Sequence, residues 1–252
     1  MTTKSVFVAV PAYGDIAPPT MISLFRARDE ARQAGWQCEI HIRPGDSMIH
    51  RARNAQLTAF LASDASDMVF WDADIAAAPG AFLRLISHPV DFVGGAYRFR
   101  SDPEDYPIRW RGALTADPAT RLLTNPGLGL PAGFLRITRK AIERMTAFFP
   151  DLWVRERDGS RLTWLFDFLV VDHEAFSEDF IFCQRFREAG GTVWLDPSLL
   201  LHHSGSKTFT GAYTHFLGRQ LAARTTKADL DEAQLALDAA FATPLARGEG
   251  QR

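Results

Sequence analysis

The stretch "MVFWDADIAAAPG", Met68 to Gly80, joins an apolar run to two acids that have only Ala73 between them. If the run is a strand, residues two apart point to the same side, so Asp72 and Asp74 can address one ligand together. Two carboxylates this close repel each other and need a cation or strong donors to stay ionised. Carboxylate oxygens suit Mg²⁺ or Mn²⁺, which keep positions open for phosphate oxygens. The structural alternative is that Asp74 caps the next helix and Asp72 is a turn residue.

Strand and helix patterns alternate on both sides of this stretch. Continuous apolar runs predict strands buried on both faces of a sheet, and amphipathic segments between them predict helices. This alternation predicts an α/β fold with a doubly wound, mostly parallel sheet and helices on both faces. Ligands bind such sheets outside the carboxyl ends of the strands, where the two acids would lie. The sequence predicts strands at residues 5–10, 36–43, 67–75 and 91–99, and helices at 20–35, 45–63 and 79–89.

The rest of the chain is less regular. Residues 101–130 are rich in Pro, Asp, Gly and Arg, which predicts an excursion from the sheet. The main domain is expected to span residues 1–224, and residues 225–252 to form a C-terminal amphipathic helix and a frayed tail. Beyond the excursion the sequence predicts a strand and a helix at 130–150, a hairpin turn at Asp158-Gly159, a helix at 177–191 capped by Ser177, and a strand pair at 192–205.

The bulk composition narrows the function classes. The chain has 252 residues, of which 46% are hydrophobic and 23% charged, and its formal net charge is −2. This balance gives no electrostatic case for a nucleic-acid partner. No apolar run approaches the ~18 residues of a membrane span, and the N-terminal sequence meets a proline too early for a signal peptide. We expect a soluble, cytoplasmic protein that can still work at the membrane periphery, with Cys38 and Cys183 as buried reduced thiols.

Two further clusters carry groups that can do chemistry. Glu178 and Asp179 fall in the first turn of a predicted helix, where acids either stabilise the helix dipole by ~0.3–1 kcal/mol or supply a general base for a substrate hydroxyl. His202 and His203 follow an apolar run; a lone histidine there is more often structural, but beside the acid pair one imidazole can add a metal ligand. Lys207, in the loop that follows, can meet a phosphate as a point charge.

Seven short motifs occur in a fixed order: "PAYG", "RARN", "FWDADI", "GGAYRFR", "AGF", "SEDFIFCQRFREAGGTVWLDP" and "HHSG". In this order the chain resembles nucleotide-sugar-dependent glycosyltransferases of the GT-A fold, most closely the bacterial members of the broad family 2 type. The resemblance covers roughly Val6 to Gly211. It implies a Rossmann-like GT-A domain, a Mn²⁺ (or Mg²⁺) cofactor, a nucleotide diphosphate sugar donor such as a UDP-sugar, and transfer of a hexose.

The resemblance also implies a role for each matching position. Asp74 is implied as the direct metal ligand, with Asp72 in the same metal set but nearer the ribose, and His203 as the metal histidine of an H-x-G pattern. Asp179 is implied as the base beside the acceptor, with Glu178 as its acidic neighbour. Pro11, Ala12 and Tyr13 match the loop that holds the base and ribose; Arg51 and Asn54 match a helix facing the nucleotide, or are merely the solvated side of that helix; Gly95, Tyr97 and Arg98 match the strand end beside the sugar; Gly133 and Phe134 match a segment lining the sugar or acceptor pocket.

The implied reaction moves a sugar to an acceptor hydroxyl on a glycan, a lipid-linked molecule or a protein, and the excursion at residues 101–130 is implied on the acceptor side. With Asp179 as base it is a single displacement that inverts configuration, although related folds also retain it. A sugar nucleotidyltransferase would carry a Gly-rich, Arg-containing loop directly after the first strand, which "PAYGDIAPP" lacks. A catalytically lapsed nucleotide- or glycan-binding module is the non-enzyme alternative, and a metal-dependent phosphohydrolase would need more clustered histidines. The C-terminal helix can pack on the domain or form a homo-oligomer contact.

Overall fold

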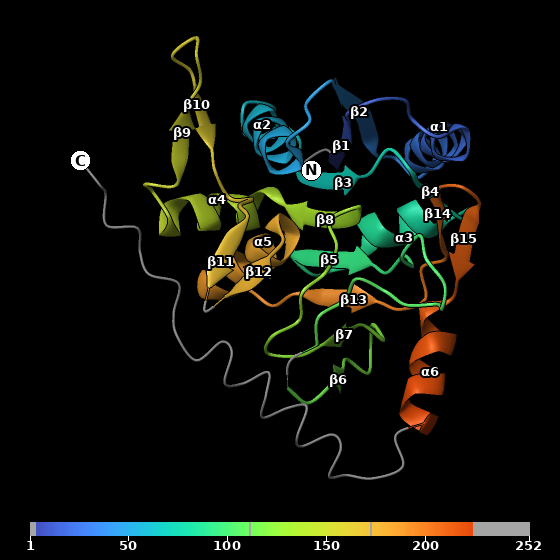
Figure 1. The fold of residues 1–252 in the computed structure, drawn as a ribbon. Helices are drawn as coiled ribbons and strands as arrows, with labels where there is room; N and C mark the ends of the chain where they lie inside the picture. The colour runs from blue at the N-terminus through green and yellow to red at the C-terminus, as the bar shows by residue number, and fades with distance from the viewer. Residues whose placement is uncertain (1–3, 111, 172, 224–252) are drawn as a thin grey trace.

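The computed structural model describes residues 4–110, 112–171 and 173–223 (Figure 1). The expected C-terminal helix and tail, residues 225–252, lie outside these described residues. The helices are α1 (Pro18–Gln33), α2 (Ile49–Leu61), α3 (Ala81–Ser87), α4 (Arg139–Phe148), α5 (Glu178–Glu188) and α6 (Tyr213–Ala223). The strands are β1 (Ser5–Ala12), β2 (Gln37–Pro44), β3 (Asp67–Trp71), β4 (Ile75–Ala77), β5 (Phe92–Gly95), β6 (Thr115–Ala116), β7 (Leu123–Thr124), β8 (Phe134–Thr138), β9 (Trp153–Arg155), β10 (Arg161–Thr163), β11 (Leu169–Val171), β12 (Glu174–Phe176), β13 (Trp194–Asp196), β14 (Leu201–Ser204) and β15 (Thr208–Gly211).

The central sheet has the strand order β2-β1-β3-β8-β5-β13-β7-β6. β1 runs parallel to β2 and β3, and β13 runs parallel to β5. β8 lies between β3 and β5 and runs antiparallel to both. The chain leaves β5 at its carboxyl end, and the described residues of 101–130 contain no helix that would carry it across the sheet. It therefore enters β8 from the same end of the sheet. The sheet is therefore mostly parallel, as predicted, with one reversed strand near its centre and the short β6–β7 pair at its edge.

Alternate residues of β3 enter two separate hydrophobic cores. Met68 and Phe70 pack in the core that also contains residues of α2, α4 and α5. Val69 and Trp71 pack in the other core, with residues of α1 and α3. The two groups of helices lie on opposite faces of the sheet in Figure 1. Burial on both faces explains why β3 appears in the sequence as an uninterrupted apolar run.

Smaller antiparallel units surround the central sheet. β14 pairs with both β15 and β4, and this register places His203 opposite Ile75, directly after the two acids of the opening motif. β9 and β10 form the predicted hairpin, with Gly159 in its turn at a positive φ of 87°. β11 and β12 form a second hairpin just before α5. The β14 pairing is the step that brings a histidine from the C-terminal part of the chain to the end of β3.

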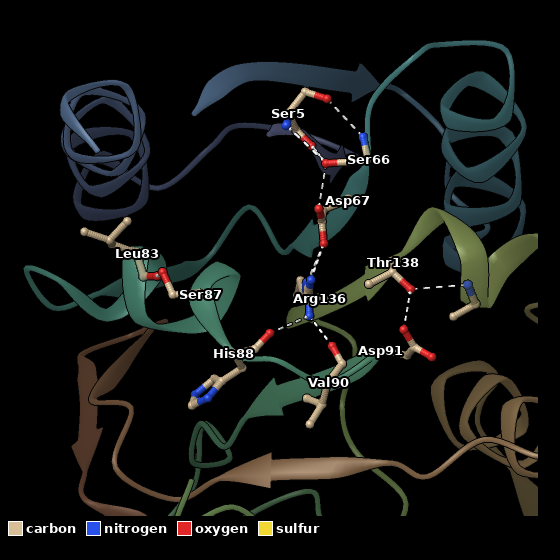
Figure 2. A network of polar contacts seen from close by, with 11 residues as sticks. Ser5, Ser66, Asp67, Leu83, Ser87, His88, Val90, Asp91, Arg136 and Thr138 are labelled. Carbon is tan, nitrogen blue, oxygen red and sulfur yellow. Dashed lines mark hydrogen bonds and ion pairs between the residues drawn. The ribbon is translucent and has the colours of Figure 1, made fainter. Parts of the chain in front are cut away.

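A buried polar network fixes the amino end of β3 (Figure 2). Arg136 of β8 donates to Asp67 Oδ1 (2.7 Å) through Nε, and its Nη1 donates to the carbonyl oxygens of His88 and Val90. Ser66 Oγ donates to the other carboxylate oxygen of Asp67 at 2.8 Å. Both charged side chains are almost fully buried, so each needs the partners that it has. The network ties β3 and β8 to the segment that leads into β5.

Two expectations about the chain as a whole can be compared with the structure. Within the described ranges, no helix has both the length and the apolar character to cross a membrane. Cys38 and Cys183 are buried free thiols, as predicted. Burial raises the pKa of Cys38 to about 11 and that of Cys183 to about 12, so neither is a thiolate at neutral pH.

Candidate active site

The two acids of the opening motif lie on a tight turn. β3 ends one residue before Asp72, and Ile75 N donates to Asp72 O (3.2 Å), while Asp72 N donates to Gly133 O (3.0 Å). The expectation that Asp72 and Asp74 project from one side of a strand is therefore wrong, because the turn directs them to different partners. Asp74 does not cap α3 either, since the N-cap residue of α3 is Gly80.

Asp74 faces two basic side chains. His203 Nε2 lies 3.3 Å and Arg100 Nη1 lies 3.1 Å from the same oxygen, Asp74 Oδ2. His203 Nδ1 lies 2.9 Å from Arg98 O, and because a carbonyl oxygen only accepts, Nδ1 carries the ring proton. Burial acts to raise the pKa of Asp74, but the hydrogen bond and charge of His203 and the charge of Arg100 outweigh burial, and the pKa lies below its usual value. Asp74 is thus an anion at neutral pH.

Arg53 of α2 connects the first acid of the motif to the acids of α5. Its side chain is only 3% exposed; Nη2 donates to Asp72 Oδ1 (2.8 Å) and Nη1 donates to the Glu178 carboxylate. The resemblance implies a site role for Arg51 of the same motif and none for Arg53. The position of Arg53 in the helix could have indicated its role. Arg53 falls on the buried side of α2, where a charged side chain needs a partner.

Asp179 lies next to Glu178 in the first turn of α5 and has a different environment. Burial and then the charge of Glu178 raise the pKa of Asp179 to about 6, against the opposing charge of Arg53. Its Oδ1 accepts from the Ser177 hydroxyl and from Phe180 N (2.9 Å). The predicted side-chain cap by Ser177 is not formed, because its hydroxyl points to Asp179. A carboxyl with a pKa near 6 is suited to general-base chemistry near neutral pH.

Gly133 and Tyr97 complete the wall beside Asp72. A Cβ added at Gly133 would lie 2.6 Å from Asp72 Oδ2 and 2.6 Å from the Tyr97 hydroxyl, so only glycine leaves room for both. Tyr97 is buried, and its ring lies edge-on to that of His203 with centroids 5.2 Å apart. Burial, and then the charge of Asp72, hold the pKa of Tyr97 well above its usual value, so it is a neutral phenol that links the two acid sites.

Three of the predicted site residues are parts of the core. Asn54 is fully buried and bonds the backbone of Phe166 with both ends of its amide, at 2.7 and 2.9 Å. It therefore faces neither a nucleotide nor solvent, and both interpretations of Asn54 are wrong. A Cβ on Gly95 would meet buried leucines, and Phe134 is fully buried. These positions shape the fold near the site and offer no surface to a ligand.

Arg98 and Lys207 point away from Asp74. Arg98 Nη2 lies 2.8 Å from Asp102 Oδ1, and Lys207 Nζ lies 2.5 Å from Asp102 Oδ2. Arg98 contributes to the site through its carbonyl oxygen, which orients the ring of His203. His202, the neighbouring residue of β14, makes its contact elsewhere, with Nδ1 3.0 Å from the hydroxyl of Thr210.

Arg51 lies in a separate groove. A groove of about 820 Å³ is bordered by the end of β2, the start of α2 and the β9–β10 hairpin. Arg51 crosses it, with Nη1 2.7 Å from Asp46 and Nη2 2.6 Å from Glu156. The guanidinium is therefore already neutralised by two acids, and the expectation that Arg51 faces a nucleotide stays a prediction.

The end of β1 offers one side chain to a ligand. Pro11 and Ala12 are buried, whereas Tyr13 is 73% exposed. An exposed aromatic ring at the carboxyl end of a parallel strand is suited to stack on a nucleobase. Of the three residues expected in this loop, Tyr13 is the one whose side chain is available.

The residues present fit a cation that is shared with a substrate. Across the described parts of the chain, no three His, Cys, Asp or Glu side chains form a group that could hold a metal ion. Asp72 therefore does not form such a group with Asp74 and His203, and Arg53 holds its Oδ1. One carboxylate and one imidazole suit Mn²⁺, and cations in phosphate sites commonly take one or two protein ligands and complete their shell with phosphate oxygens and water.

Solved structures give a fold comparison. The chain is similar to A197 from STIV, with a TM-score of 0.51 and 17% identity over 82% of this chain and 93% of that chain. A second alignment, at 10% identity and a TM-score of 0.32, covers 55% of this chain and 62% of a glycosyltransferase involved in the glycosylation of the major capsid of PBCV-1. No protein-family model matches the chain, and no curated protein sequence matches it. The second alignment is too weak to carry an argument, and the likeness to A197 from STIV shows the fold alone.

Proposed function

We propose that this protein is a metal-dependent glycosyltransferase that moves a sugar from a nucleoside diphosphate sugar to an acceptor hydroxyl. The observation that carries the proposal is the pairing of Asp74 Oδ2 with His203 Nε2 at 3.3 Å. Because Arg98 O accepts from Nδ1, Nε2 is the nitrogen that donates to Asp74, and a divalent cation that replaced this Nε2 proton would lie between an imidazole lone pair and a carboxylate oxygen. Metal-binding histidines commonly have this second hydrogen bond to a carbonyl.

A divalent cation held between these two groups would supply positive charge against the diphosphate leaving group. Asp74 and His203 bind it from the end of β3 and from β14. Asp72 lies on the other side of the turn, beside Gly133 and Tyr97, and we assign it to the ribose. Tyr13 would stack on the base. This division keeps Asp72 out of the metal shell, in agreement with its bond to Arg53.

Asp179 is proposed as the base on the acceptor side. Its carboxylate takes the proton from the acceptor hydroxyl while that oxygen forms a bond to the anomeric carbon and the bond to the diphosphate oxygen breaks. This single displacement inverts the configuration of the sugar. The pKa of about 6 that burial and Glu178 give Asp179 keeps it ionised, yet basic, near neutral pH. Glu178 is held by Arg53. We assign it a positioning role beside Asp179, and it does not transfer the proton.

The donor can be identified with the metal and a panel of nucleotide sugars. We expect one donor, a UDP-sugar, to raise the melting temperature with Mn²⁺ present and to have little effect in EDTA, because a ligand of the folded state stabilises it. Asp74→Asn should abolish the Mn²⁺-dependent part of the shift. Asp29→Asn, which removes an exposed acid of α1, is the matched control and should behave like the parent chain.

Two results would contradict the proposal. One is an equal shift with Mn²⁺ and with EDTA for every donor; the other is an Asp74→Asn variant that retains the Mn²⁺ effect. Release of the nucleoside diphosphate over time, measured with the same donor, separates an active transferase from a module that only binds.

A further inference from the structure

Arg100 has no role in the reaction described so far, yet it contacts the candidate metal site. It follows β5 and Tyr97, and its Nη1 lies 3.1 Å from Asp74 Oδ2, the oxygen that also faces His203. The Arg100 side chain is 54% exposed, compared with 13% for His203. Its charge therefore lies at the surface of the site and can leave Asp74 without crossing the core.

The turn between β14 and β15 accommodates this side chain. A Cβ added at Gly205 would lie 2.9 Å from Arg100 Cδ and 3.4 Å from the ring of Phe209. Gly205 N donates to Lys207 O at 3.0 Å, which closes the turn. The aliphatic part of Arg100 thus rests directly on the backbone of the turn that follows His203.

The other two basic side chains near this turn already have a partner. Arg98 and Lys207 both bind Asp102, one on each carboxylate oxygen. Of the three, Arg100 is the side chain that contacts Asp74. Of these three cations, it is therefore the one whose position depends on what else Asp74 binds.

We propose that Arg100 is the counter-ion of Asp74 while no metal is bound. When the metal binds Asp74, Arg100 leaves this carboxylate and binds the diphosphate of the donor. The inference rests on the proposed function. A guanidinium and a divalent cation on one carboxylate oxygen repel each other strongly at such separations, so the metal displaces Arg100. The guanidinium fork matches phosphate oxygens well, so a diphosphate gives Arg100 a new partner. Metal and diphosphate should therefore bind cooperatively.

Arg100→Gln tests both halves of the inference. With Mn²⁺ alone, the variant should bind the metal about threefold more tightly than the parent, which is the scale of a partly exposed ion pair. Once Mn²⁺ is bound, its affinity for UDP should fall on the order of tenfold, because charge-assisted hydrogen bonds are lost. Free Mn²⁺ is measured by electron paramagnetic resonance and UDP binding by calorimetry. Arg28→Gln removes an equally charged, partly exposed arginine of α1 and should change neither affinity.

Gly205→Ala is a second variant that moves Arg100 without removing its charge. Its Cβ would displace the flexible side chain from Asp74, so we expect tighter Mn²⁺ binding with unreduced affinity for UDP. An Arg100→Gln variant that folds, binds Mn²⁺ no more tightly than the parent and keeps full UDP affinity would overturn the inference. Absence of Mn²⁺ binding in the parent and in both variants would instead overturn the metal site, and this inference with it.

Discussion

Strand β3 has an acid at each end, and both acids are paired with a buried arginine. At the amino end, Asp67 binds Arg136, whose remaining donors go to backbone carbonyls (Figure 2). At the carboxyl end, Asp72 binds Arg53, which is shared with Glu178. The first pair is complete in itself, because each polar group has a protein partner. The second belongs to a larger group in which the charges do not cancel.

The difference lies in the balance of charge. Around the carboxyl end of β3 there are four acids, Asp72, Asp74, Glu178 and Asp179, and the arginines that contact them directly are Arg53 and Arg100. His203 faces Asp74 with the nitrogen that Arg98 leaves free. Burial, and then the charge of the neighbouring Glu178, raise the pKa of Asp179 to about 6. A buried ion pair alone is therefore no sign of function, whereas an unbalanced cluster with a perturbed carboxyl is.

The largest expected effect comes from breaking the Asp67–Arg136 pair at the amino end of β3. Arg136→Met should lower the free energy of unfolding by about 4 kcal/mol, because it leaves the buried Asp67 carboxylate without its partner. Urea unfolding measures the loss. Arg28→Met, on the surface of α1, is the matched control and should stay within about 0.5 kcal/mol of the parent. A loss below about 1 kcal/mol in Arg136→Met would show that the network is not needed for stability.

The next largest effect is expected from the acidic cluster at the carboxyl end of β3. Asp179→Asn should reduce kcat by about a hundredfold, the lower range for loss of a general base. UDP affinity with Mn²⁺ should stay within about threefold, since Asp179 is assigned to the acceptor. Steady-state kinetics with the donor found in the nucleotide-sugar panel measure the change. A variant with parental kcat would remove Asp179 from the mechanism.

The pH dependence refines the same assignment. Asp179 must be ionised to accept a proton, so kcat/KM should fall about tenfold per pH unit below the pKa of about 6 and level off above it. The contribution of Asp179 to the free energy of unfolding changes with pH in the opposite direction to kcat/KM. A carboxyl whose pKa is raised by folding contributes most below its unfolded pKa of about 4, and this contribution is lost as the pH rises through about 6. The acid limb should be absent from Asp179→Asn, and its persistence there would point to another group.

The smallest effect is expected for Arg51, which lies on the same helix as Arg53. Arg51 is about one third exposed and bridges Asp46 and Glu156, so Arg51→Gln should cost under about 1 kcal/mol of stability. It should also leave Mn²⁺ binding unchanged, because Arg51 lies in the groove beside the β9–β10 hairpin. Urea unfolding and Mn²⁺ titration measure the two quantities. A large loss of Mn²⁺ affinity would place this groove in the same site as Asp74.

The motif order predicted much of the candidate site, but not how its members are divided. Asp74, His203, Glu178, Asp179 and Tyr97 lie close together beyond the end of β3, as the resemblance implies. Asn54 and Phe134, which the resemblance implies beside a ligand, are core residues. A one-sequence pattern gives the spacing of residues along a helix or strand, whereas which face meets a neighbour depends on packing between distant segments.

The sequence by itself determined the α/β alternation, the mostly parallel sheet and the two apolar faces of β3, because these follow from local periodicity. Only the tertiary structure decided that the two acids of "DAD" lie on a turn and serve different partners. It also decided that Arg53, rather than Arg51, joins Asp72 to α5, and that Arg100 shares Asp74 with His203. Those facts depend on side chains up to 129 residues apart in the chain, and no local pattern records such a contact.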